Sequence, residues 1–196
     1  MAYVTLVERP KAIIRRGAAI YARRRFGRPV EPAMAASHHN GVLVSMGVME
    51  TSVELGWRKL DQGLRHLAIQ LASTRIGCSW CVDYGYYETV NHGMDPEKIR
   101  SVGQWRESTL YDERERAVLE YAELATATPV SVPAAVIERL REFLSEAEVV
   151  ELASWVALEN FRSRFNGGLG LKSQGFAESC QVPLTPAAAQ ALVSER

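Results

Sequence analysis

Two cysteines three residues apart are the residues of this sequence best suited to do chemistry. Cys78 and Cys81 stand in the stretch GCSWCVDYGYYETVNH, which begins at Gly77. Within one helical turn, two sulfurs are close enough to form a disulfide, so the pair can alternate between dithiol and disulfide. We predict that both cysteines lie at a helix start, where unpaired backbone N–H groups and the helix dipole lower the pKa of a thiol.

Two other uses of the pair stay open at this point. A zinc site needs two further ligands, and only Cys180, His66 and His92 could supply them, none at the spacing of a zinc motif. Alternatively, both cysteines are small apolar residues of a core. A thioredoxin fold is excluded, because it places a C-x-x-C pair after a strand, and both flanks here have helical patterns. We favour redox chemistry and expect no bound metal or other cofactor.

The segments that flank the pair are predicted to be helices. Residues 54–74 carry leucines and alanines three and four positions apart, which indicates one helix with an apolar face. Gly77 interrupts this pattern. Residues 78–91 form a second predicted helix, which His92 and Gly93 close.

The rest of the chain follows the same pattern, and strand signals are scarce. Further helices are predicted over residues 112–126, after Pro133, and from Ser145 toward Asn166. Ser145 and Glu148 have the spacing of a capping box, which marks a helix start. The predicted fold class is therefore all-α.

Composition indicates one ordinary globular domain over residues 1–196. Hydrophobic residues make up 47% of the chain and charged residues 23%, which is enough to bury a sizeable core. Within this domain we expect a C-x-x-C core over about residues 54–126. A basic helix over about residues 10–28 is expected to dock on the body or on a neighbouring subunit. The apolar segment around Trp155 leads us to expect a homo-oligomer.

Charge and hydropathy exclude several classes of partner. The 23 basic and 23 acidic residues cancel, so the chain has no net field to attract nucleic acid or an anionic membrane. No apolar run approaches the roughly 20 residues of a membrane-spanning helix, and Glu8 and Arg9 interrupt any signal-peptide core. We expect a cytoplasmic protein. In that reducing compartment a close cysteine pair is more often catalytic or metal-binding than structural.

Several motifs beyond the cysteine pair follow one another along residues 60–126. They are LRHLAIQL, CSWCVD, WRES and ERAVLEYA, and LASWVALENFRSRFN follows later in the chain. In this order they resemble the AhpD-like alkylhydroperoxidase branch of the carboxymuconolactone decarboxylase family. The resemblance implies an all-α subunit that assembles as an oligomer. It also implies reduction of peroxides at the cysteine pair with electrons from another dithiol.

The resemblance implies roles for individual residues as well. Cys81 matches the family's second cysteine, whose thiolate attacks the peroxide O–O bond and becomes a sulfenic acid. Cys78 matches the first cysteine, which condenses with that sulfenic acid and expels water. A glutamate and a histidine form the family's proton relay. Here the two matching positions hold His66 and Gly85.

Two interpretations of His66 follow from this departure. Either its protonated imidazole replaces the relay and holds Cys81 as a thiolate, or His66 is a packing residue and the peroxidase relay is lost. We predict a thiol-dependent peroxidase or disulfide oxidoreductase that acts on a peroxide or another small molecule, with a dithiol protein as reductant. The alternatives are a different enzyme on the same scaffold, such as a decarboxylase, and a non-catalytic oligomeric protein. Cys180 is expected to be a free thiol.

Overall fold

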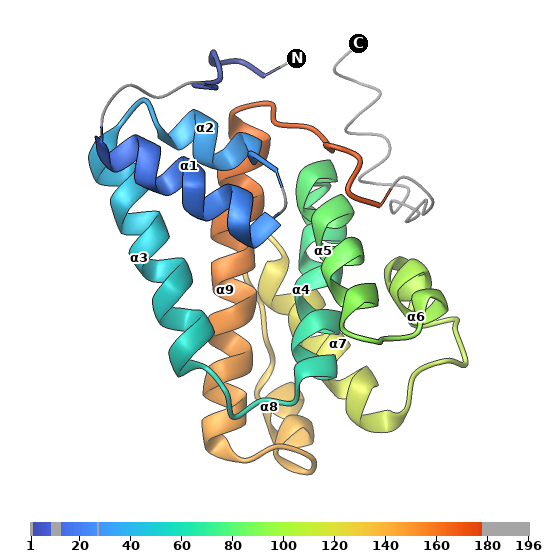
Figure 1. Ribbon diagram of the computed structural model, residues 1–196. Helices are drawn as coiled ribbons and strands as arrows, with labels where there is room; N and C mark the ends of the chain where they lie inside the picture. Colours follow the sequence, from blue (N-terminus) through green and yellow to red (C-terminus); the bar gives the residue numbers. More distant parts are fainter. Residues whose placement is uncertain (1, 9–12, 27, 178–196) are drawn as a thin grey trace.

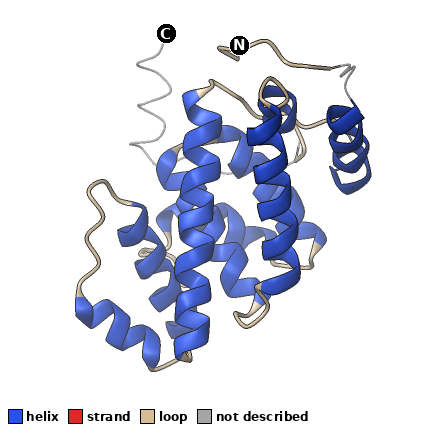
Figure 2. Ribbon diagram, turned by 90° about the vertical axis from the view of Figure 1, so that its left-hand side faces the viewer, coloured by secondary structure: helices blue, strands red, loops and turns tan. Residues whose placement is uncertain are grey.

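Helices make up the regular secondary structure of the described residues. The computed structural model describes residues 2–8, 13–26 and 28–177, so Cys180 lies outside the described residues, as do residues 10–12 and 27 of the predicted basic helix. These described ranges contain no strand (Figure 2), which confirms the all-α fold class. The elements in chain order are α1 (Ile13–Phe26), α2 (Glu31–Ala36), α3 (Asn40–Gly56), α4 (Gln62–Ile76), α5 (Ser79–Asn91), α6 (Pro96–Ser101), a 3-10 turn η1 (Val102–Gln104), α7 (Glu113–Thr126), α8 (Ala134–Arg141) and α9 (Glu146–Gly168).

Polar side chains begin several helices at the positions that the sequence predicts. Cys78 is the N-cap of α5, and its Sγ accepts the backbone N–H of Cys81 at 3.2 Å. Asp112 before α7 and Ser145 before α9 each form a capping box, which satisfies backbone donors that a helix start leaves unpaired. Gly77 ends α4 with a φ of 83°, a left-handed conformation that favours glycine. These ends place the cysteine pair at the start of α5, directly after the end of α4.

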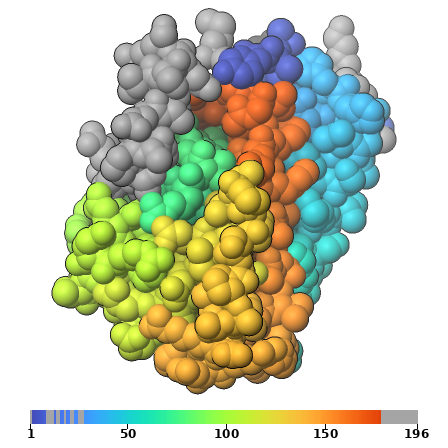
Figure 3. Space-filling view, turned by 180° about the vertical axis from the view of Figure 1, so that it is seen from behind, coloured from blue at the N-terminus to red at the C-terminus, as the bar shows by residue number. Residues whose placement is uncertain are grey.

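The central helix of the bundle is α4 (Figure 1). It packs against α5, α7 and α9, and its residues Leu67, Ala68 and Leu71 are fully buried. Burying one leucine side chain stabilises a fold by about 1.5–3 kcal/mol. Seen from behind, α7, α8 and α9 form one continuous face (Figure 3), in agreement with the contacts among them. Leu64, Leu67, Ala68 and Leu71 are all buried, so the apolar face predicted for residues 54–74 is confirmed over α4.

The predicted helix over residues 54–74 is wrong at its N-terminal end. A loop separates α3 from α4 there, and its last residue, Asp61, is the N-cap of α4. The loop is also tied to α9, because the backbone N–H of Lys59 donates to Glu151 Oε2 at 2.7 Å. A local cap and one long-range hydrogen bond thus interrupt a hydrophobic periodicity that continues across the loop.

The helices α1, α2 and α3 form a layer beside α9 (Figure 1). Because α1 contacts α2 and α3, the described part of the predicted basic helix docks on the body of its own chain. Trp155 is 1% exposed within this single chain, so it gives no support to the expected association of subunits. Over the described ranges, every helix is too short or too polar to cross a membrane.

Candidate active site

The cysteine pair lies at the start of α5, as predicted, and its sulfurs are joined in a disulfide. The Cα atoms of Cys78 and Cys81 are 5.3 Å apart, a normal separation for this bond. The two residues are 3% and 7% exposed and pack with Val30 and Trp80. The pair can therefore form the bond that a dithiol–disulfide cycle requires, in a place that bulk solvent barely reaches.

Asn166 of α9 distinguishes the two sulfurs. Its Nδ2 is 3.3 Å from Cys81 Sγ and 3.9 Å from Cys78 Sγ, so it donates chiefly to Cys81. A donor that points at a sulfur favours the thiolate over the thiol. Cys81 also lines the cavity described next, whereas Cys78 does not. Cys81 is thus the sulfur that a small molecule in the cavity meets.

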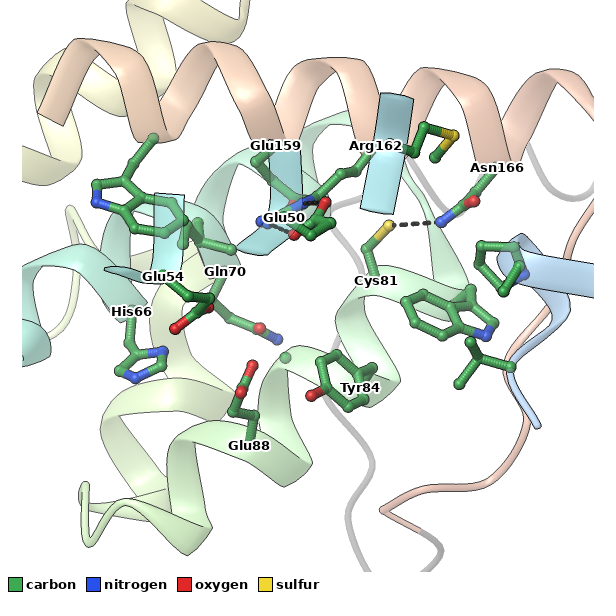
Figure 4. A pocket seen from close by; sticks show the side chains of 18 of the residues that line it. Glu50, Glu54, His66, Gln70, Cys81, Tyr84, Glu88, Glu159, Arg162 and Asn166 are labelled. Carbon is green, nitrogen blue, oxygen red and sulfur yellow. Dashed lines mark hydrogen bonds and ion pairs between the residues drawn. The ribbon is translucent and has the colours of Figure 1, made fainter. Parts of the chain in front are cut away.

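A cavity of about 230 Å³ lies beside Cys81 between α3, α4, α5 and α9 (Figure 4). Apolar side chains such as Leu43, Ile69 and Trp80 line part of it. The polar lining includes carboxylate, guanidinium, imidazole and amide side chains from four helices, namely Glu50, Glu54, Arg65, His66, Gln70, Glu88, Glu159, Arg162 and Asn166. The space suits several water molecules or one small organic molecule.

Gln70 occupies the place that a histidine at position 85 would need. It is 1% exposed on α4, and its Nε2 donates to the carbonyl of Val82 at 3.2 Å. A Cβ atom at position 85 would overlap Gln70 Oε1, so Gly85 and Gln70 fit together as a pair. Gln70 Oε1 has no hydrogen-bond partner among the described residues. Because an amide side chain does not ionise at neutral pH, Gln70 does not take over the proton transfer of that histidine.

Gly85→His is expected to lower the free energy of unfolding by about 1–3 kcal/mol, because the larger side chain must push Gln70 away from Val82. Urea unfolding measures this loss. Gly85→His combined with Gln70→Ala frees the space and should recover most of it. An equal loss in the single and double variants would show that the Gln70 amide does not limit position 85.

His66 lies in the same cavity but at its other end. Its ring centroid is 5.3 Å from that of His92, and its Nε2 is 3.5 Å from Gln62 Nε2 and 3.4 Å from Arg65 Nη2. Since His92 follows Cys81 by eleven residues, the two are separated by about 16 Å along α5. Burial, reinforced by Arg65, lowers the pKa of His66 to about 4, so the ring is neutral at neutral pH.

Both observations weigh against His66 as the protonated partner of a Cys81 thiolate. No hydrogen bond within the described part of the chain joins His66 to either sulfur, and its pKa shift favours the neutral ring. That role stays a prediction. Nor does the described part of the chain place three His, Cys, Asp or Glu side chains where they could hold a metal ion.

Two carboxylates share one guanidinium in the middle of the cavity (Figure 4). Glu50 of α3 accepts from Arg162 Nε at 2.9 Å and also from its Nη2, which makes a bidentate ion pair. Glu159 Oε2 is 3.7 Å from Arg162 Nη1, and Glu159 Oε1 accepts from Ser163 Oγ at 2.6 Å. Burial raises the pKa of Glu159 to about 7. Glu159 can therefore take up or release a proton near neutral pH.

The segment after α9 closes over the outer side of α5, and we call its residues 171–177 the strap. Asp83, two residues after Cys81, anchors it. The carboxylate of Asp83 accepts four hydrogen bonds of 2.8–3.1 Å from the strap, donated by Ser173 Oγ and by the backbone N–H groups of Gln174, Phe176 and Ala177. Trp80 Nε1 donates to Gln174 Oε1 at 2.8 Å. The strap therefore packs on the first turns of α5 beside the cysteine pair, and its Phe176 contacts the cluster that contains both cysteines.

Asp83→Ala is expected to speed reduction of the disulfide by dithiothreitol at least about tenfold. A hydrogen bond to a charged group contributes about 1.5–3 kcal/mol, so loss of this anchor raises the open fraction of the strap. Thiol release over time measures the rate. Asp95→Asn, at the remote cap of α6, is the matched control and should leave the rate unchanged. An unchanged rate in Asp83→Ala would mean that the strap does not limit access to the pair.

Comparisons with known proteins agree with the motifs and the fold. The sequence profile of the carboxymuconolactone decarboxylase family matches residues 46–124. The uncharacterised protein YnjA of Escherichia coli K12 is 32% identical over 137 residues, which cover 67% of this chain and 74% of YnjA. The chain belongs to the AhpD-like branch of the carboxymuconolactone decarboxylase family.

Solved structures resemble this chain over a longer stretch than the family profile does. ATU0492 from Agrobacterium tumefaciens, a protein of unknown function proposed to be an antioxidant defence protein AhpD, is 26% identical with a TM-score of 0.66, covering 71% of this chain and 94% of its own. The debrominase Bmp8 is 18% identical with a TM-score of 0.78, covering 90% and 94%. An uncharacterised peroxidase-related protein from Silicibacter sp. TM1040 is also 18% identical with a TM-score of 0.78, covering 90% and 93%. The last two share the fold of this AhpD-like chain.

The sequence predicted the cysteines of this AhpD-like chain, but it did not predict the polar residues of α9 that line the cavity. Glu159, Arg162 and Asn166 follow one another at spacings of three and four, so they share one face of α9. Trp155 begins the same row. A row of polar residues in line with a buried tryptophan is the signal that could have revealed them. Gln70 gives a weaker signal, since it only follows His66 by one helical turn.

Proposed function

We propose that this protein is a thiol-dependent peroxidase that reduces a hydroperoxide at Cys81 and then closes the disulfide with Cys78. The observation that carries the proposal is the setting of Cys81. Its sulfur pairs with Cys78, accepts from Asn166 and faces the cavity. Membership of the AhpD-like branch supports the same chemistry, and so does the likeness to a protein called peroxidase-related.

The reaction uses two steps at the two sulfurs. The Cys81 thiolate attacks the terminal oxygen of the hydroperoxide, the O–O bond breaks, and the alkoxide leaves and takes up a proton. Cys78 then attacks the sulfenic acid at Cys81, the S–S bond forms, and the hydroxyl leaves as water. The cysteine pair thereby loses two electrons and the hydroperoxide gains them. An external dithiol protein returns the two electrons by thiol–disulfide exchange.

Thiol titration with cumene hydroperoxide as the probe tests this function. The reduced chain has three thiols, because its sequence holds three cysteines. We expect one thiol to remain after oxidation and dithiothreitol to restore all three. A chain that keeps three thiols under excess hydroperoxide would contradict the proposal.

A second candidate, reductive dehalogenation, has one specific observation in its favour. Three aromatic rings, those of Trp80, Tyr84 and Trp155, line the cavity and could hold a flat substrate. A cysteine-to-alanine variant of the debrominase Bmp8 has been seen in complex with 2,3,4-tribromopyrrole. A thiolate that takes up bromine, while the ring gains a proton, leaves a sulfenyl bromide that a second thiol converts to the same disulfide. Release of one bromide for each two thiols lost would support this candidate, and no bromide release from tribromopyrrole would exclude that compound as a substrate.

We also propose that the protein works as a homo-oligomer in the cytoplasm. The helix α3 supports association, because its side chains Val44, Val48 and Leu55 are exposed and their burial against a second copy would be favourable. A cytoplasmic location fits a cysteine pair that must be reduced again after each turnover. Light scattering at micromolar concentration tests the assembly, and a monomeric mass would contradict it.

A further inference from the structure

We propose that Glu159 is the proton relay of this site: it takes the proton of the Cys81 thiol and returns it to the oxygen that leaves the hydroperoxide. The inference rests on the proposed peroxidase function and goes beyond it. It assigns the proton transfer to α9, whereas the family's relay positions hold His66 and Gly85 here.

Burial sets Glu159 apart from the other carboxyl groups of the cavity. Glu159 is 3% exposed, whereas Glu54 is exposed and Glu50 and Glu88 are partly exposed. Both carboxylate oxygens of Glu50 accept hydrogen bonds from Arg162, so the guanidinium occupies both of them. Glu159 has looser partners. Among the described residues, its Oε1 accepts from Ser163 Oγ, whereas its Oε2 lies 3.7 Å from Arg162 Nη1, beyond ordinary hydrogen-bond distance, so Oε2 is the atom that can carry the proton.

The charges around the cavity explain why Glu159 titrates near neutral pH. The charged and titratable groups that share the cavity with it are Glu50 and Glu54 of α3, Arg65 and His66 of α4, Cys81, Tyr84 and Glu88 of α5, and Arg162 of α9. Burial raises the pKa of Glu159 to about 7, Glu50 adds to the rise, and Arg162 and Ser163 oppose it. A proton-transfer group is most effective when its pKa lies near the working pH.

The proton balance closes over one turnover. The Glu159 carboxylate first takes the proton of the Cys81 thiol, which leaves a thiolate and a carboxylic acid. The thiolate attacks the hydroperoxide, the O–O bond breaks, and the carboxylic acid gives its proton to the leaving alkoxide. The Cys78 thiol then condenses with the sulfenic acid, and its own proton leaves with the hydroxyl as water. Glu159 is again a carboxylate, ready for the next thiol.

The separation between Cys81 and Glu159 decides whether water must carry the proton between them. Glu159 and Asn166 are seven residues apart, about 10 Å along α9, and Asn166 Nδ2 contacts Cys81 Sγ. A hydroperoxide at about 3–3.5 Å from the sulfur, with one or two waters at about 2.8 Å per hydrogen bond, spans this separation. The cavity of about 230 Å³ holds them. The proton therefore passes between Cys81 and Glu159 through water.

Two rates at Cys81 separate proton supply from thiolate formation. Iodoacetamide alkylates the thiolate, and its iodide leaves without a proton, so the alkylation rate reports the thiolate fraction alone. Oxidation by cumene hydroperoxide needs the thiolate and also a proton for the alkoxide. We would measure both rates from pH 5 to 9 in a Cys78→Ser background, where serine keeps the helix cap and oxidation stops at the sulfenic acid.

The ratio of the oxidation rate to the alkylation rate then reports the proton donor. With Glu159 as the relay, the ratio should fall about tenfold per pH unit above the Glu159 pKa of about 7. Glu159→Gln keeps the shape but cannot carry the proton, so its ratio should be flat and, below pH 6, about 10²-fold lower. Ser163→Ala removes a hydrogen bond that lowers the Glu159 pKa, so the fall should move to higher pH. Glu146→Gln, an exposed glutamate on the same helix, should retain the wild-type profile.

Several results would overturn the relay. One is a Glu159→Gln protein that keeps the wild-type pH dependence while alkylation shows an intact, folded thiol site. Another is a flat ratio in His66→Ala together with a normal profile in Glu159→Gln, which would place the relay at His66. Failure of the peroxidase proposal looks different, because no hydroperoxide would then oxidise Cys81 in any variant although iodoacetamide still alkylates it.

Discussion

Cys81→Ser is expected to abolish peroxide reduction. The serine hydroxyl is a far weaker nucleophile than a thiolate, and removing an enzyme's nucleophile can cost up to about 10⁶-fold in rate. The change is small in volume, and Cys81 packs among Val30, Cys78 and Trp80, so the fold should persist. Consumption of cumene hydroperoxide in the presence of dithiothreitol measures the loss against the rate of dithiothreitol alone.

Cys78→Ser is the matched control for this prediction. The protein should consume one equivalent of hydroperoxide and stop at the sulfenic acid, which dimedone traps at Cys81. Turnover that survives in Cys81→Ser but stops in Cys78→Ser before any oxidation would reverse the assigned roles of the two cysteines. That outcome would also contradict the reading that the sulfur facing the cavity is the one that attacks.

Trp155→Ala is expected to lower the free energy of unfolding by about 3–5 kcal/mol, the usual cost of removing a buried aromatic side chain. Trp155 is 1% exposed, its ring meets Trp57 edge-on at 5.0 Å, and its Nε1 donates to Glu151 Oε1 at 3.3 Å. Glu151 also accepts from Lys59, so the loss reaches the loop between α3 and α4. Guanidinium unfolding followed by circular dichroism measures the effect.

Phe161→Ala provides a comparison on the same helix. Phe161 is 45% exposed, and a surface substitution of this kind usually changes stability by about 0.5 kcal/mol or less. Similar losses in Trp155→Ala and Phe161→Ala would contradict the assignment of Trp155 to the core. A large loss confined to Trp155→Ala would agree with it.

Local signals predict much of this fold because they act over a few residues. The capping boxes at Asp112 and Ser145, the left-handed Gly77 and the cap at Cys78 all appear where the sequence places helix ends. The boundary between α3 and α4 was missed, because the apolar spacing continues across it. There the backbone of Lys59 is held by Glu151, ninety-two residues away, and no local pattern reports such a bond.

The site was predictable only where the chemistry is local. Cys78 and Cys81 are close in sequence, so their spacing alone indicates a disulfide, which the structure contains. Asn166 and Glu159 reach the cavity only because α9 packs on α4 and α5, an arrangement that spacing along the chain does not specify. The departure at Gly85 likewise makes sense only once Gln70 is seen to fill the space above it.

Mass spectrometry of the tryptic peptide 76–98 tests the redox role of the pair most directly. Trypsin cuts after Arg75 and Lys98, so this peptide carries Cys78 and Cys81 without Cys180. We predict that cumene hydroperoxide removes the mass of two hydrogens from this peptide and that dithiothreitol restores it. A peptide that keeps its reduced mass under excess hydroperoxide, with oxidation confined to Cys180, would contradict a redox function for the pair.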